Sequence, residues 1–101
     1  MVEFGITEVR HVLKECDLAQ FYLRSGYVKD DDLLKVNLLE DYGLDSLDFE
    51  EMCSTVWYEY KIKLEDNAMD KSSFREEPTV DNFINMVNAY GYYLDLDDDD
   101  I

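Results

Sequence analysis

The chain has 101 residues, and its 25 Asp and Glu residues outnumber its 9 Lys and Arg residues, which gives a net charge of −16. This charge argues against a nucleic-acid-binding protein, because phosphates would be repelled, and no basic patch is available for an anionic membrane surface. Hydrophobic residues still make up 47% of the chain, enough for one small globular domain. We expect this domain to span residues 1–92, and residues 93–101 to form an acidic, mobile tail.

The first residues have neither the basic start nor the apolar core of a signal peptide, and no apolar run is long enough to span a bilayer. A cytoplasmic protein is therefore expected. Cys16 and Cys53 both fall on apolar helical faces, which predicts two buried, reduced thiols. Their spacing leaves a disulfide between them open as the alternative.

A first amphipathic helix is predicted for residues 7–24, and Gly26 is expected to end it. His11, on this helix, has no second His or nearby Cys at the spacing of metal ligands, so we expect no metal site there. The apolar residues that recur at helical spacing are Ile6, Val9, Leu13 and Cys16.

Residues 27–45 are predicted to be mostly loop. Asp30, Asp31 and Asp32 form a like-charged run that we expect to be solvated, and residues 39–43 can form one helical turn. A loop of this length in a compact domain normally has a function or contains a short helix of its own.

The strongest pattern in the chain predicts a helix at residues 46–60. Gly43 has the freedom to turn the backbone before this helix. Asp45 and Ser46 are both suitable N-cap residues, because a side-chain oxygen can accept from the unpaired N–H groups of the first turn. Leu47 lies off the apolar face and is expected to be partly exposed. The apolar face comprises Phe49, Met52, Cys53, Val56 and Tyr60.

The alternating residues 61–64 are interpreted as an extended connector, because no strand is evident for them to pair with. A last helix is predicted to begin after Thr79 as N-cap and to end at Gly91. We expect this helix and the helix at residues 46–60 to face each other and the first helix. The side chains predicted to be buried between them are Phe49, Met52, Val56, Phe83, Ile84 and Val87.

The start of the 46–60 helix resembles a known family. The sequence Gly43-Leu44-Asp45-Ser46-Leu47-Asp48 is similar to the Asp-Ser-Leu motif of acyl carrier proteins, and the resemblance covers residues 27–90. It implies an all-α fold, a four-helix bundle with a long first loop and a short third helix between residues 67 and 74. It also implies that Ser46 carries phosphopantetheine, whose thiol holds acyl intermediates as thioesters in fatty-acid, polyketide or related biosynthesis. The alternative is that Ser46 is an ordinary N-cap.

The resemblance further implies that the surface around Ser46 recognises a phosphopantetheinyl transferase and acyl-processing enzymes with basic patches. Opposite charges would accelerate the encounter between such partners and this acidic chain. We expect the protein to be a monomer. The residues predicted to contact the partners are Asp45, Leu47, Asp48, Glu50 and Glu51.

The sequence offers no catalytic constellation, because it contains one His in total and no phosphate-binding Gly-rich loop. We therefore predict a carrier protein without catalytic activity and without a metal site. Two other functions stay open. One is an unmodified acidic protein-interaction module of the same fold. The other is a divalent-cation binder that uses the Asp-rich tail, although the tail lacks the Gly and the spaced Glu of an EF-hand loop.

Overall fold

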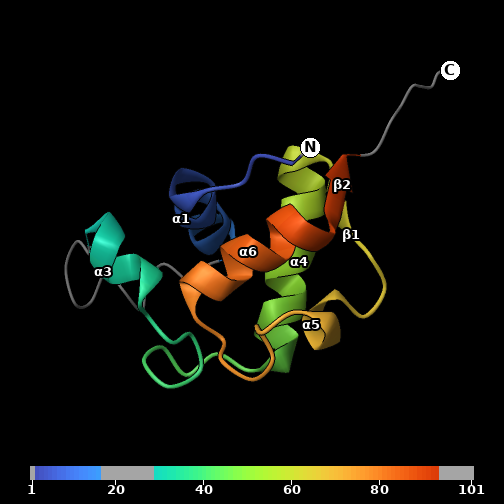
Figure 1. Cartoon of the computed structure of the whole chain (residues 1–101). Coiled ribbons are helices and arrows are strands. Elements are labelled where there is room, and N and C mark those ends of the chain that lie inside the picture. Colours follow the sequence, from blue (N-terminus) through green and yellow to red (C-terminus); the bar gives the residue numbers. More distant parts are fainter. Residues whose placement is uncertain (1, 17–28, 94–101) are drawn as a thin grey trace, which may run out of the picture.

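The computed structural model describes residues 2–16 and 29–93. Figure 1 shows α4 at the centre, with α1 to one side of it and α6 crossing in front. The predicted helix at residues 46–60 is confirmed as α4. In chain order the elements are α1 (Ile6–Glu15), α3 (Asp30–Leu34), α4 (Ser46–Tyr60), β1 (Ile62–Leu64), α5 (Ala68–Lys71), α6 (Val80–Tyr90) and β2 (Gly91–Tyr93).

The predicted all-α four-helix bundle is wrong. The described residues contain five helices and a two-stranded antiparallel sheet, in which Ile62 pairs with Tyr93 and Leu64 pairs with Gly91. The interpretation of residues 61–64 as an unpaired connector is therefore also wrong. Their partner is the strand that directly follows α6, so the pairing depends on how the ends of α4 and α6 lie in space. The alternation of polar and apolar residues over three positions is too short a pattern to indicate that a distant strand pairs with them.

Two further predictions concern the C-terminal half of the chain: a short third helix and the end of the domain. The short third helix expected between residues 67 and 74 is present as α5, although it has only four residues. The predicted domain boundary after residue 92 falls within β2. The predicted mobile tail falls mainly on residues 94–101, which lie outside the described residues.

The core is centred on a cluster of aromatic rings. The ring of Phe74 is fully buried, with its centroid 4.9 Å from that of Phe49 and 5.4 Å from that of Phe83. Five of the six side chains predicted for the core are buried, but Ile84 is only partly buried. On α6 the buried face includes Met86 instead, because the helix is rotated slightly from the orientation that the sequence pattern suggested.

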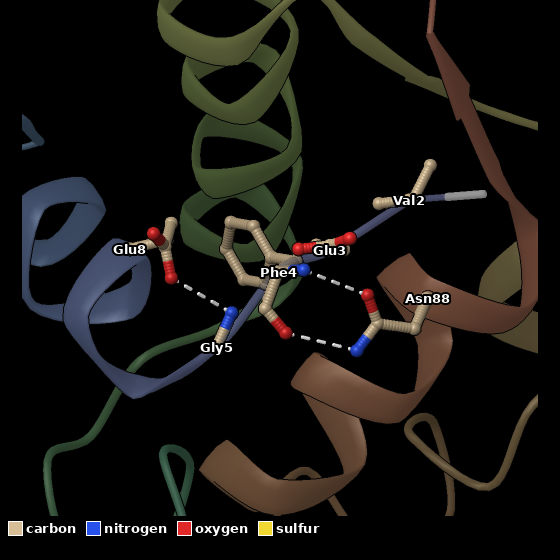
Figure 2. A pocket seen from close by; sticks show the side chains of 6 residues that line it. All are labelled: Val2, Glu3, Phe4, Gly5, Glu8 and Asn88. Carbon is tan, nitrogen blue, oxygen red and sulfur yellow. Dashed lines mark hydrogen bonds between the residues drawn. The ribbon is translucent and has the colours of Figure 1, made fainter.

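The first residues form an extended segment that packs against α6, which the sequence did not lead us to expect. Val2 and Phe4 are buried in the core. Figure 2 shows how the side-chain amide of Asn88 replaces a strand partner: its oxygen accepts from the Phe4 N–H and its nitrogen donates to the Phe4 carbonyl, both at 2.9 Å. The Gly5 N–H donates to Glu8 Oε1 at 2.9 Å and α1 begins directly afterwards. These residues line an open hollow (Figure 2). Their hydrogen bonds therefore fix the chain just before α1 begins.

α1 is shorter than the predicted first helix. It ends at Glu15, and the predicted continuation at residues 17–24 lies outside the described residues, as does Gly26. Both cysteines are free thiols. Cys16 is buried as predicted, whereas Cys53 is only half-buried.

The segment before α4 is more ordered than a loop. The acidic run that begins at Asp30 forms the first turn of α3, where negative charge is favourable for the helix dipole. Arg10 on α1 forms an ion pair with Asp30 at 2.8 Å. Further along, the Leu38 N–H donates to the Pro78 carbonyl at 2.8 Å. These contacts attach the segment to α1 at one end and to the residues preceding α6 at the other.

The ends of α6 differ in how well the sequence predicted them. Thr79 is the N-cap as predicted, and its Oγ1 accepts from the Asn82 N–H at 3.1 Å. Gly91 follows the last helical residue as predicted, but its backbone is extended rather than left-handed because it begins β2. A Cβ at this position would collide with the Val87 carbonyl oxygen and lie 2.9 Å from Ile62 Cγ2. Gly91 is therefore required by close packing.

Candidate functional site

The N-terminus of α4 is closed by two aspartates. Asp45 is the N-cap, and its Oδ1 accepts from the N–H groups of Leu47 at 3.1 Å and Asp48 at 3.2 Å. Asp48 Oδ2 accepts in return from the Asp45 N–H at 3.0 Å. This reciprocal arrangement is a capping box in which Asp replaces the usual Glu or Gln. It satisfies the start of the helix without help from Ser46.

Ser46 is the first residue of α4 and is exposed. Within the described part of the chain its hydroxyl makes no hydrogen bond. The chain reaches it through a turn in which the Gly43 N–H donates to the Leu39 carbonyl at 3.0 Å, consistent with the predicted turn at residues 39–43. Gly43 has a left-handed backbone (φ 71°), and the next residue, Leu44, is anchored in the core. The hydroxyl therefore lies on a well-supported helix end and faces solvent.

A hollow of about 210 Å³ lies next to Ser46. A second hollow of about 320 Å³ shares two of its lining residues, Met69 and Arg75, and continues along α4 to Cys53. Arg75 contributes the positive charge in both linings and forms an ion pair with Asp70. The smaller hollow thus combines apolar walls with one guanidinium group. Its lining residues are Leu39, Asp45, Ser46, Phe49, Met69, Arg75 and Pro78.

The five residues predicted to contact partners lie around this helix end, but they are not equivalent. Leu47 is 72% exposed, which confirms its predicted exposure. Asp45, Glu50 and Glu51 are exposed as well. Asp48 is only half-buried and its carboxylate is engaged in the capping box. The exposed residues are three acidic side chains and one apolar side chain, and we call Asp45, Leu47, Glu50 and Glu51 the acidic rim.

Two features near α4 were missed by reasoning from the sequence. Arg75 lies in a polar segment without a recognisable pattern, so no local signal places it near Ser46. His11, Glu15 and Glu59 come together at the contact between α1 and α4, with potential ligand atoms within 4.8 Å of one another. The spacing of His11 and Glu15 puts them one helical turn apart and was a usable signal, whereas nothing in the sequence joins Glu59 to them.

The thiol that lines the second hollow, Cys53, has a raised pKa. Burial, followed by the negative charge of Glu50 and the proximity of Cys16, raises the pKa of Cys53 from 9.0 to about 12. A thiol with so high a pKa holds almost no thiolate near neutral pH, and the thiolate is the nucleophilic form. Cys53 is therefore a packing residue and gives no support to nucleophilic catalysis.

Comparison of the chain with protein-family models, with curated proteins and with solved structures finds no match. Across residues 2–16 and 29–93, no helix has both the length and the apolar character needed to cross a membrane.

Proposed function

We propose that the protein is a carrier whose Ser46 hydroxyl accepts phosphopantetheine and which has no catalytic activity of its own. The observation that carries the proposal is the exposure of this hydroxyl at the first position of α4, with the capping role filled by Asp45. A phosphodiester at this position would lie at the positive end of the helix dipole, where negative charge is favourable. The prosthetic group supplies a thiol that holds acyl groups as thioesters.

The residues next to Ser46 are compatible with such a group. Arg75 offers a guanidinium for a phosphate, and Phe49, Met69 and Pro78 offer apolar contacts in the same hollow. Asp45 and Asp48 bring negative charge close to the attachment point, but both carboxylates are occupied by N–H groups of the helix start. The site thus keeps its acidic surface for partners and provides one basic group, Arg75, at the hollow next to Ser46.

The partners that fit this surface are enzymes with basic patches, among them a phosphopantetheinyl transferase in the cytoplasm. The acidic rim would accelerate the encounter through long-range attraction, and Leu47 would contribute apolar burial in the complex. The carrier would act as a monomer in fatty-acid, polyketide or related biosynthesis.

The test is modification of the full chain with coenzyme A and a broad-specificity transferase, followed by intact-mass measurement. One phosphopantetheine should be added to the wild type and none to Ser46→Ala. Ser54→Ala is the matched control, because Ser54 is an exposed serine on the same helix and should leave modification unchanged. Absence of modification in the wild type would contradict the proposal and favour an unmodified acidic interaction module.

Recognition is tested by charge reversal on the acidic rim. Glu51→Lys should slow modification, chiefly through the association rate, and weaken its dependence on salt. The matched controls are Asp97→Lys and Asp98→Lys, which change the net charge equally at positions outside the rim. Asp48→Lys is unsuitable by itself because it also removes a capping contact. If the tail variants slow modification as much as Glu51→Lys, bulk charge and not the rim governs recognition.

A further inference from the structure

The contact between α1 and α4 brings together three side chains that can ligate a metal ion. His11 and Glu15 lie one turn apart on α1, and Glu59 reaches them from the last turn of α4. His11 Nε2 and Glu59 Oε1 are 3.0 Å apart, and all three potential ligand atoms lie within 4.8 Å of one another. Among the described residues, these three side chains form a group of His and Glu compact enough to bind one metal ion.

The spacing of these atoms is close to that of a zinc site. Zn²⁺ binds His nitrogen and carboxylate oxygen at about 2.0–2.2 Å, which places the ligand atoms of a tetrahedral site about 3.3–3.6 Å apart. Because the present atoms lie within 4.8 Å of one another, we expect rotation of the carboxylate groups to bring them to this spacing. Glu15 is free to make this adjustment, because it is exposed and its carboxylate has no hydrogen bond or ion pair with another described residue.

The positions of the ligands are set by two packed helices. His11 lies edge-on against the ring of Tyr60, with centroids 5.9 Å apart and an interplanar angle of 75°. Its neighbour Val12 and the α4 residue Val56 are fully buried, which fixes α1 and α4 relative to each other. The His11 and Glu59 side chains remain 40% and 38% exposed, so an ion can enter from solvent.

The charge and chemistry of the group select the kind of ion. Two carboxylates held close together repel each other. A divalent cation between them attracts both, and this attraction outweighs the repulsion. The net charge of −16 also raises the local concentration of cations. One imidazole with two carboxylates suits Zn²⁺, whereas Ca²⁺ takes six to eight oxygen ligands and Mg²⁺ prefers oxygen in octahedral geometry.

We propose that His11, Glu15 and Glu59 form a Zn²⁺ site that joins α1 to α4. Three protein ligands leave a fourth position for water, so the ion bridges the helices and remains open on the solvent side. The site is separate from Ser46, which lies at the opposite end of α4 (Figure 1). Zinc binding would therefore stabilise the helix pair without competing with modification at Ser46.

Isothermal titration of the chelator-treated full chain with Zn²⁺ is the first test. The wild type should bind one Zn²⁺ per chain, and Glu15→Gln and Glu59→Gln should each weaken the affinity at least tenfold. Glu76→Gln is the matched control, because Glu76 is exposed, lies outside the α1–α4 contact and undergoes the same loss of charge. Ca²⁺ at the same concentrations should give no saturable binding.

Thermal unfolding gives a second measurement that does not depend on binding heats. Zn²⁺ should raise the unfolding temperature of the wild type and of Glu76→Gln, because a ligand that binds only the folded chain stabilises it. The shift should disappear in Glu59→Gln. The proposal would be overturned if the wild type showed no saturable Zn²⁺ binding, or if Glu76→Gln lost as much Zn²⁺ affinity as Glu59→Gln. It would also be overturned if Zn²⁺ affinity were lost only in a further variant in which Asp97 and Asp98 are replaced by Asn.

Discussion

The two ends of α4 solve the same problem in different ways. At the N-terminal end, the Leu47 and Asp48 N–H groups donate to the Asp45 side chain, and the Asp45 N–H donates to the Asp48 side chain three positions along. At the C-terminal end, Lys61 turns the chain with a left-handed backbone (φ 58°), and β1 then pairs with the distant β2. The N-terminal end is capped by residues of its own segment, which leaves Ser46 exposed. The C-terminal end leads into a strand that pairs with a distant part of the chain.

This difference teaches where a modifiable side chain can be placed. A helix end that supplies its own cap needs no covering element, so its first residues stay available to other molecules. An end that continues into a strand is instead tied to a distant segment by the backbone pairing of that strand. Substitutions near each end of α4 can test whether local contacts support the first end and distant contacts the second.

The largest effect is expected from Phe74→Ala. Phe74 is fully buried and its ring contacts those of Phe49 and Phe83. The substitution should lower the free energy of unfolding by about 3–5 kcal/mol in urea denaturation. Trp57→Ala is the control, because this side chain is 48% exposed, and it should cost much less. A loss below about 1 kcal/mol for Phe74→Ala would mean that the aromatic cluster is not the support of the N-terminal half of α4.

Gly91 and Gly43 should respond differently to substitution. Gly91→Ala should destabilise the protein by about 1–3 kcal/mol, because the new Cβ collides with the Val87 carbonyl and meets Ile62. Gly43→Ala should cost about 1–2 kcal/mol for a different reason, its left-handed backbone, since a Cβ there meets no atom within 4 Å.

Replacement by Asn separates the two causes. Asn tolerates a left-handed backbone, so Gly43→Asn should be milder than Gly43→Ala. At Gly91 the restriction is one of space, so Asn should be at least as damaging as Ala. Urea denaturation of the four variants checks this pattern, and a rescue by Asn at Gly91 would refute the packing explanation.

A smaller effect is expected at the cap of α4. Asp45→Ala removes the acceptor of two N–H groups and should lower the free energy of unfolding by about 1 kcal/mol. Ser46→Ala should change it by only a few tenths, because the Ser46 hydroxyl has no partner in the described chain. Thermal unfolding of the two variants makes the comparison. Equal losses would show that Ser46 shares the capping role.

The smallest effect on stability at neutral pH is expected for Cys53, midway along α4. Its pKa is raised to about 12, so the folded state retains the thiol proton more strongly than the unfolded state. The resulting stabilisation is complete below pH 9 and is lost as the pH rises toward 12. Between these values the stability of the wild type should fall more steeply than that of Cys53→Ala.

Alkylation tests the same shift in pKa through the reactivity of the Cys53 thiol. At pH 8, iodoacetamide should react with Cys53 at least ~100-fold more slowly in the folded chain than in urea, because the thiolate population is so low. Equal rates in the two states would show that Cys53 is neither protected nor shifted in pKa.

The sequence by itself determined the features that depend on residues a few positions apart. The bounds of α4, the N-cap at Thr79 and the exposure of Leu47 follow from helical periodicity and capping chemistry. The candidate attachment residue Ser46 and its acidic neighbours were identified from a resemblance to the acyl carrier protein motif, which is also a short local pattern. These features are local because the hydrogen bonds of a helix and its cap connect residues no more than about four positions apart.

Only the tertiary structure decided the contacts between distant residues. It joined β1 to β2, replaced the predicted four-helix bundle, and placed Arg75 beside Ser46 and Glu59 beside His11. Each of these contacts depends on the angle and rotation at which whole helices pack, and a single sequence carries no local signal of either. The reason is physical: side chains far apart in the chain meet only after the core has fixed the elements that carry them.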